Sequence, residues 1–266
     1  MPPGYGKGDY ESRGARDTFL DITGDPRNPK YQRVLLVELR QAQAGSRRTY
    51  RPVEIHAGDM GWVGDFLYIA NRPGSSIPVR RGGMSVFDVT KTVRVTGGAA
   101  ARNRFGYRNG QYCAYGCNYV LLLHHIYENV AASGFQYSQL SLDRTQGATT
   151  SIVSSEYRPD EQGRAARWNL AASGYLADEY SDSSWELRTA RVQGAVSVGG
   201  SAYYSANAEE PGTAGQRAGI PRRREGKARE ALPRPRGSQL HDRSQRKSLG
   251  VGEHPRRRRV YRVGLN

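Results

Sequence analysis

The chain has 266 residues, a hydrophobic fraction of 37% and a formal net charge of +15. No apolar run approaches the length of a membrane-spanning helix, and Cys113 and Cys117 are too few for a disulfide framework, so we expect neither of these classes of protein. The 32 Gly and 13 Pro favour short strands joined by many turns over a helical bundle. The first residues also lack the apolar segment of a secretory signal, which leaves a cytoplasmic location as an alternative.

The positive charge is concentrated at the C-terminus. Residues 211–266 contain 16 Arg and Lys against four Asp and Glu, whereas residues 1–210 contain 24 against 21. Residues 211–259 contain no Trp, Phe or Tyr and few large aliphatic residues, so they cannot bury enough apolar surface to offset an ordering entropy of about 1–2 kcal/mol per residue. We therefore expect an Arg/Pro-rich disordered segment there. Either a functional tail or GC-rich coding sequence read out of frame would have this composition.

In chain order, residues 1–30 are polar and Gly-rich, and we expect them to be flexible. Apolar patterns then predict a β-domain over residues 31–210, with residues 91–111 as a basic loop. The expected strands are Gln32–Leu39, Tyr50–His56, Phe66–Ala70, Met84–Val89, one or two within Gln111–Val130, Phe135–Asp143, Thr149–Tyr157, Arg164–Leu170, Trp185–Val198 and Ala202–Asn207. Residues 260–266 alternate again, which predicts a closing strand.

A stretch of 16 residues is similar to a second stretch of the same length later in the chain. Residues 56–71 (HAGDMGWVGDFLYIAN) align without a gap to residues 192–207 (VQGAVSVGGSAYYSAN). The coinciding residues are Gly58 with Gly194, Gly64 with Gly200, Tyr68 with Tyr204, Ala70 with Ala206 and Asn71 with Asn207. Internal similarity of this kind is typical of repeat architectures.

The GDFLYIAN and GGMSVFDV portions resemble the blades of a β-propeller. Further motifs are RNPKY at 27–31, HAG at 56–58, SLDR at 141–144, SEY at 155–157, RWNL at 167–170 and VQGAVS at 192–197. Together they are similar to an uncharacterised family of secreted actinobacterial propeller-like proteins, over about residues 24–207 and again at residues 253–255 and the final strand. The resemblance implies an all-β fold of four-stranded blades and an extracytoplasmic location, but no established reaction. Because a blade takes roughly 40–50 residues, about four or five blades are expected, few for a closed ring.

A propeller directs residues at the start of its innermost strands into a central channel, where ligands and metals bind. His56 and Asp59 would lie at such a position, and Gln193 precedes the glycine that matches Gly58. Three more residues could join them: Asp143, Arg144 and Glu156. The same side chains could instead bind backbone groups at turns and strand ends, and the sequence leaves both roles open.

Other patterns are weaker. Cys113, Cys117, His124 and His125 lack the spacing of a common zinc site, so we expect structural cysteines. The acidic run at 178–182 lacks the spacing and glycine of a calcium loop. GYGKG at 4–8 follows no expected strand and is a poor phosphate cradle.

Three functions fit these patterns. We favour a non-enzymatic binding or scaffolding protein for a small molecule or a protein, because it requires only the scaffold. The second is a metal-dependent hydrolase or lactonase, with His56, Asp59, Asp143 and Glu156 around a divalent cation. The third is nonspecific, salt-dependent binding of polyanions by residues 211–259, without the interleaved aromatic rings that stack nucleic-acid bases.

Overall fold

The computed structural model describes residues 13–21, 30–41, 47–72, 82–129, 134–147, 149–159, 162–187, 189–198, 201–206, 238–244, 247–254 and 257–264. Within these residues the fold is all-β, with one short 3-10 helix, η1 (Gly98–Ala101). The expected all-β class is therefore confirmed.

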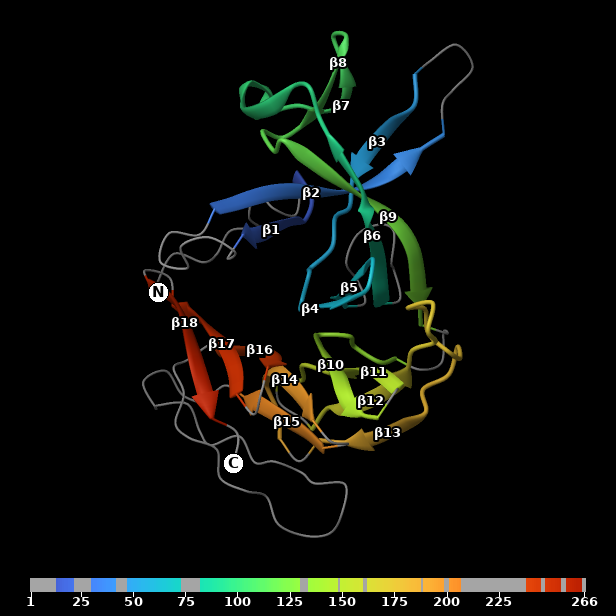
Figure 1. Cartoon of the computed structure of the whole chain (residues 1–266), viewed down its shortest axis with the longest axis vertical. Helices are drawn as coiled ribbons and strands as arrows, with labels where there is room; N and C mark the ends of the chain where they lie inside the picture. The colour runs from blue at the N-terminus through green and yellow to red at the C-terminus, as the bar shows by residue number, and fades with distance from the viewer. Residues whose placement is uncertain are drawn as a thin grey trace.

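The largest sheet has seven strands and curls around a core of its own (Figure 1). Its order is β1 (Arg16–Asp21), β2 (Lys30–Arg40), β9 (Tyr119–Glu128), β6 (Gly83–Arg94), β5 (Phe66–Asn71) and β4 (Met60–Val63), with β3 (Thr49–Pro52) also paired to β2. The β2–β9 pair is parallel, and the other pairs are antiparallel.

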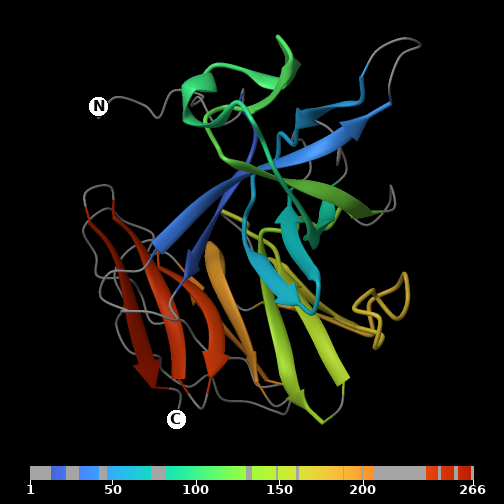
Figure 2. The same ribbon diagram turned by 45° about the horizontal axis from the view of Figure 1, so that its top comes forward.

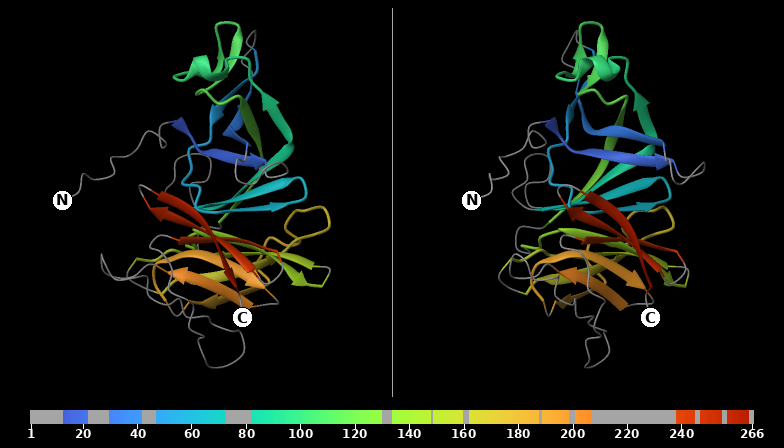
Figure 3. Two further views of the ribbon diagram at one scale, coloured as in Figure 1. Left: turned by 60° about the vertical axis from the view of Figure 1, so that its left-hand side comes forward. Right: turned by 90° about the vertical axis from the view of Figure 1, so that its left-hand side faces the viewer.

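Four smaller sheets complete the described fold. They are the meander β10 (Gln139–Gln146), β11 (Thr149–Ser155), β12 (Arg164–Asn169), β13 (Ser183–Glu186); the hairpin β14 (Val192–Val198), β15 (Ser201–Ala206); the sheet β16 (Ser238–Ser244), β17 (Lys247–His254), β18 (Arg257–Gly264); and the hairpin β7 (Phe105–Arg108), β8 (Gln111–Ala114). Figures 2 and 3 show β10–β18 as one layer at one end of the molecule and β7, β8 and η1 at the other.

An Asp-x-Thr motif occupies an irregularity in each of two long strands. In β6 the pairing with β9 shifts between Phe87 and Thr92, and in β10 the pairing with β11 shifts after Asp143. Asp88 Oδ1 accepts hydrogen bonds from Thr90 N (3.0 Å) and Oγ1 (2.5 Å). The carboxylates thus satisfy backbone donors that leave the ladder, and such irregularities increase the bend of a strand.

The meander packs against one face of the large sheet. Tyr68, Val86 and Ala70 from β5 and β6 meet Leu140, Ile152 and Trp168 in one buried cluster. Tyr68 is fully buried, and its hydroxyl donates a hydrogen bond to the Gly174 carbonyl (2.5 Å). This contact joins the loop between β12 and β13 to the large sheet.

The expected repeat of four-stranded blades is not confirmed. One sheet, β10–β13, has four consecutive antiparallel strands, as a blade would. The large sheet instead inserts β9 between β2 and β6, so strands far apart in sequence are neighbours. Local hydrophobic patterns carry no information about such pairing, which is why the sequence did not reveal it.

The two copies of the internal repeat form corresponding hairpins. Residues 60–71 form β4 and β5, and residues 192–206 form β14 and β15. Their registers differ, because Val63 pairs with Phe66 whereas Val198 pairs with Ser201. Phe66 aligns with Ala202, and the gap-free alignment would pair Ala202 with Gly199, whereas its observed partner is Ser197. The repeated residues therefore encode a hairpin without fixing its register.

The structure corrects the expected boundaries at both ends and in the middle. β1 lies within residues 1–30, where we expected a flexible segment, because it pairs with β2. β7 and β8 lie in or beside the expected loop 91–111. β16, β17 and part of β18 lie within 211–259, where we expected disorder; short alternating stretches such as residues 247–251 allow antiparallel pairing even without aromatic rings. Residues 211–237 and GYGKG at 4–8 lie outside the described residues.

A substitution at Gly58 would test how closely residues 56–60 approach the β10 layer. A Cβ atom there would lie 2.3 Å from the Ser138 carbonyl oxygen, whereas at Gly64 it would meet nothing within 4 Å. We expect Gly58→Ala to lower the free energy of unfolding by about 3 kcal/mol through overpacking. Gly64→Ala should lower it by about 1 kcal/mol, because only its φ of +53° is unfavourable. Urea denaturation measures both, and equal losses would contradict this packing.

Candidate functional site

His56 and Asp59 do not face a common site. His56 is exposed, whereas Asp59 is buried, with 4% of its surface accessible. Asp59 Oδ1 accepts a hydrogen bond from Met60 N (2.8 Å), and Oδ2 accepts one from Leu140 N (3.4 Å). Asp59 therefore ties the start of β4 to the start of β10, the strand-end role that the sequence left open.

Asp143 is fully buried and accepts several hydrogen bonds. Its Oδ1 accepts hydrogen bonds from Thr145 N (2.9 Å) and Oγ1 (2.5 Å), and its Oδ2 accepts from Arg167 (3.1 Å) and Ser197 Oγ (2.9 Å). Burial alone would raise the pKa of Asp143, but the hydrogen bonds from Thr145, Ser197 and Arg167 outweigh it and hold the pKa below its usual value. The network joins β10, β12 and β14 and leaves Asp143 with no exposed surface.

Glu156 follows β11 and is also committed to structural partners. Its oxygens accept hydrogen bonds from the backbone N–H groups of Gln136 (2.9 Å) and Arg164 (2.8 Å), and ion pairs form with Arg158 (3.0 Å) and Arg164 (3.1 Å). Burial opposes ionisation, but these partners together lower the pKa of Glu156. Glu156 thus closes the connection between β11 and β12.

The predicted channel residues are consequently dispersed. Within the part of the chain that the structure describes, no three His, Cys, Asp or Glu side chains lie close enough to hold a metal ion. Gln193 is half-buried on β14, and Arg144 is exposed on β10. Of the six predicted site residues, Arg144 alone lines the groove described below, and this groove was not predicted from the sequence.

The cysteine and histidine cluster is likewise not a metal site. Cys113 and Cys117 are buried free thiols. His124 and His125 are exposed on β9, and His124 Nε2 forms a hydrogen bond with the Tyr175 hydroxyl. Burial, followed by the neighbouring His124, lowers the pKa of His125. In the acidic run, Asp182 accepts hydrogen bonds from Asn169 (2.5 and 2.8 Å), which anchors that loop to β12.

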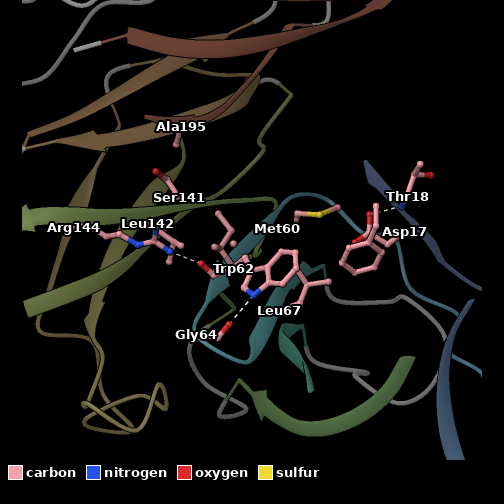
Figure 4. A pocket seen from close by; sticks show the side chains of 13 residues that line it. Asp17, Thr18, Met60, Trp62, Gly64, Leu67, Ser141, Leu142, Arg144 and Ala195 are labelled. Carbon is pink, nitrogen blue, oxygen red and sulfur yellow. Dashed lines mark hydrogen bonds between the residues drawn. The ribbon is translucent and has the colours of Figure 1, made fainter. Parts of the chain in front are cut away.

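A groove of about 740 Å³ lies between the large sheet and the β10 layer. The lining residues are 17–19 from β1, 60–62 and 64 from β4 and its turn, Leu67 from β5, 140–142 and 144 from β10, and Ala195 from β14. Figure 4 shows the Trp62 indole in the middle of the groove, with Asp17 and Met60 to one side and Arg144 to the other. Two apolar residues here are unusually exposed, Trp62 at 47% and Met60 at 39%.

The orientation of Trp62 is fixed by its own surroundings. Its Nε1 donates a hydrogen bond to the Gly64 carbonyl (2.7 Å), and Phe19 meets the indole edge to face at a centroid distance of 5.6 Å. Arg144 donates a hydrogen bond to the Trp62 carbonyl, which connects β4 to β10 (Figure 4). Because the indole N–H is already bound, a ligand would meet the ring face and its apolar edge.

Asp17 provides a carboxylate at the same groove. Burial raises the pKa of Asp17 above its usual value, and the hydrogen bond from Thr18 N (2.7 Å) opposes this effect only in part. A carboxylate with few compensating partners is a strong acceptor for hydroxyl, amide or ammonium groups of a ligand.

Sequence reasoning missed Asp17, Phe19, Met60 and Trp62. Met60 and Trp62 alternate with Gly61, a pattern that places both on one face of a strand. Gly61 itself approaches β10, since a Cβ there would lie 2.6 Å from Leu140 Cδ2. This alternation could have identified Trp62 as facing away from the tightly packed side, whereas Asp17 and Phe19 lie in a segment that we expected to be flexible.

The scaffold thus belongs to the class of all-β proteins with an open, aromatic-lined groove between two sheets. No protein-family model, curated protein or solved structure matches this chain. Among the described residues, no helix has the length and apolar character needed to cross a membrane.

Acid should weaken the fold through Asp143 and Glu156. Both folded pKa values lie below their unfolded values, so their stabilisation is complete above about pH 5 and is lost as the pH falls through the folded pKa values. Asp143→Asn should cost about 3–5 kcal/mol at pH 7, because buried Arg167 loses its counter-charge, and should flatten the acid decline. Urea denaturation from pH 7 to pH 3 measures both effects. Exposed Glu179→Gln is the control, with a change below about 0.5 kcal/mol, and an unaltered acid decline in Asp143→Asn would refute this role.

Proposed function

We propose that this protein is a non-enzymatic binding protein whose ligand occupies the groove around Trp62. The observation that carries this proposal is the exposed but orientationally fixed indole in a cavity of about 740 Å³. Small-molecule sites are concave, mostly apolar and provided with a few convergent polar groups. Asp17, Thr18, Ser141 and Arg144 are such groups along the groove.

The chemistry of the groove defines the ligand in general terms. A flat or apolar face would stack on Trp62 beside Phe19 and Met60, while hydroxyl or amide groups would meet Asp17 and Ser141. Either a small molecule or an aromatic side chain of a partner protein has these properties. Asp143 and Glu156 are bound to arginines, so they are poorly placed to act as the acid and base of a hydrolase.

A propeller-like relationship and an extracytoplasmic location are part of this proposal. The meander β10–β13 and the similar hairpins β4–β5 and β14–β15 support the former. An experimental structure without radially arranged sheets would remove the propeller. Fractionation of the source cells that recovered the protein only in the cytoplasm would remove the location.

Trp62 allows a direct test. Neutral aromatic fragments and neutral oligosaccharides, titrated while tryptophan fluorescence is recorded, should include ligands that change the Trp62 emission. Trp62→Leu should weaken the binding of those ligands about tenfold, because stacking contributes about 1–1.5 kcal/mol. Half-buried Trp185→Phe is the matched control and should leave affinity unchanged. Ligands that bound Trp62→Leu as tightly as the parent protein would place binding elsewhere.

A further inference from the structure

A second surface lies at the opposite end of the molecule from the β10 layer, on what we call the basic lobe: β3, η1, β7 and β8 with their connections, residues 47–52 and 95–118 (Figure 1). None of these elements lines the Trp62 groove. Residues 95–118 of the lobe are inserted between β6 and β9, which pair directly where Arg94 meets Tyr119.

The lobe is strongly basic. No Asp or Glu occurs between Asp88 and Glu128, whereas five Lys and Arg do. The exposed arginines of the lobe are Arg47, Arg48, Arg102, Arg104 and Arg108. Two acids near the lobe are paired with cations, since Asp88 pairs with Lys91 (2.9 Å) and Glu38 pairs with Arg51 (2.5 Å).

A cavity of about 920 Å³ in this lobe is lined by hydrogen-bond donors. Its polar lining residues are Arg102, Asn103, Arg104 and Gln111, and the remaining two are Ala100 and Ala101. Neither Arg102 nor Arg104 forms an ion pair with another described residue. Guanidinium groups donate hydrogen bonds in a fork that matches phosphate oxygens.

The backbone that carries these arginines is held in place. Arg104 N donates to the Ala101 carbonyl (3.1 Å), and Tyr115 N donates to the Arg104 carbonyl (2.7 Å). Between β7 and β8, Asn109 and Gly110 have positive φ values of 51° and 83°, as a tight type I′ hairpin requires. The backbone that carries the arginines is therefore ordered before a ligand binds.

Aromatic rings are interleaved with the arginines. Phe105 and Tyr107 lie between Arg104 and Arg108 in sequence, and both rings are half-exposed. The Arg47 guanidinium lies over the Tyr107 ring at 5.4 Å. Thr49 Oγ1 accepts a hydrogen bond from Tyr107 N (3.0 Å), which places Arg48 beside this hairpin. Basic groups thus continue from the cavity along β7 to the start of β3.

We propose that the basic lobe binds single-stranded nucleic acid. Arg102 and Arg104 contact phosphate groups in the cavity, Arg108 and Arg48 contact phosphates further along the strand, and a base stacks at Tyr107. A positive surface with rings suited to base stacking is the usual design of such sites. Residues 211–259 are basic too but contain no Trp, Phe or Tyr, so the lobe supplies the large rings that this segment lacks.

The charge contribution is tested with the full chain and a labelled single-stranded DNA of about 12 nucleotides, by fluorescence anisotropy over a range of salt concentrations. Arg102→Gln/Arg104→Gln should weaken binding about tenfold and reduce the slope of log K against log salt by about 1.4, from two phosphate contacts at about 0.7 each. Lys30→Gln/Arg33→Gln removes the same charge from exposed positions on β2 and should change neither value. Equal effects of the two double variants would overturn the proposal, because the C-terminal segment is present in both.

The base contribution is tested with Tyr107→Leu and three competitors. This variant should weaken DNA binding about fivefold or more and leave binding of a sulfated polysaccharide unchanged. Competition by a mononucleotide but not by inorganic phosphate would locate the recognition in one nucleotide, and competition by the oligonucleotide alone would require a strand. Equal affinity for the polysaccharide, with no effect of Tyr107→Leu on DNA, would overturn nucleic-acid binding. Thermal unfolding verifies that each variant is folded.

Discussion

The architecture depends on β9 pairing along both of its edges. One edge joins β2 in parallel through Val34–Val37 and Tyr119–Leu122, and the other joins β6 in antiparallel orientation. This arrangement turns two sets of antiparallel strands into one seven-stranded sheet. It also contributes to the placement of β4 and β5, because β5 pairs with β6 on one side and β4 on the other. Within the sheet, β9 therefore links the hairpin that carries Trp62 to β1 and β2.

The two Asp-x-Thr motifs illustrate which contacts can be predicted from the sequence and which cannot. An Asp side chain that accepts a hydrogen bond from the backbone N–H two residues later involves only neighbouring residues. Such a contact can be recognised from a short sequence motif. Asp88 and Asp143 both do this with the following Thr90 and Thr145. The sequence identified Asp143 as a polar strand-end residue and left its role open; the additional bonds to Arg167 and Ser197 decide that role. They come from β12 and β14, so no local pattern could have shown them.

The strands could be predicted from local sequence patterns, whereas their pairing into sheets could not. Continuous apolar runs such as residues 34–37 correctly indicated a strand buried on both faces. The order of strands was out of reach, because the β2–β9 pairing joins residues about 85 positions apart. The groove was equally out of reach, since Asp17, Trp62, Arg144 and Ala195 come from four strands. Arg144 was selected from the sequence as a channel residue, yet it contributes by holding the Trp62 carbonyl and lining the groove.

Both proposed binding surfaces are formed before a ligand arrives. Trp62 is oriented by Gly64 and Phe19, and in the lobe the rings of Tyr50, Tyr112 and Tyr107 contact one another at centroid distances of 6.1 and 5.0 Å. Trp62 nevertheless remains 47% exposed. Side chains ordered in advance lose little rotamer freedom on binding, a cost of about 0.5–1.5 kcal/mol for each long side chain that must be immobilised. These side chains lose their rotamer freedom during folding and not on binding. The groove and the basic lobe are therefore suited to bind ligands without a large change of shape.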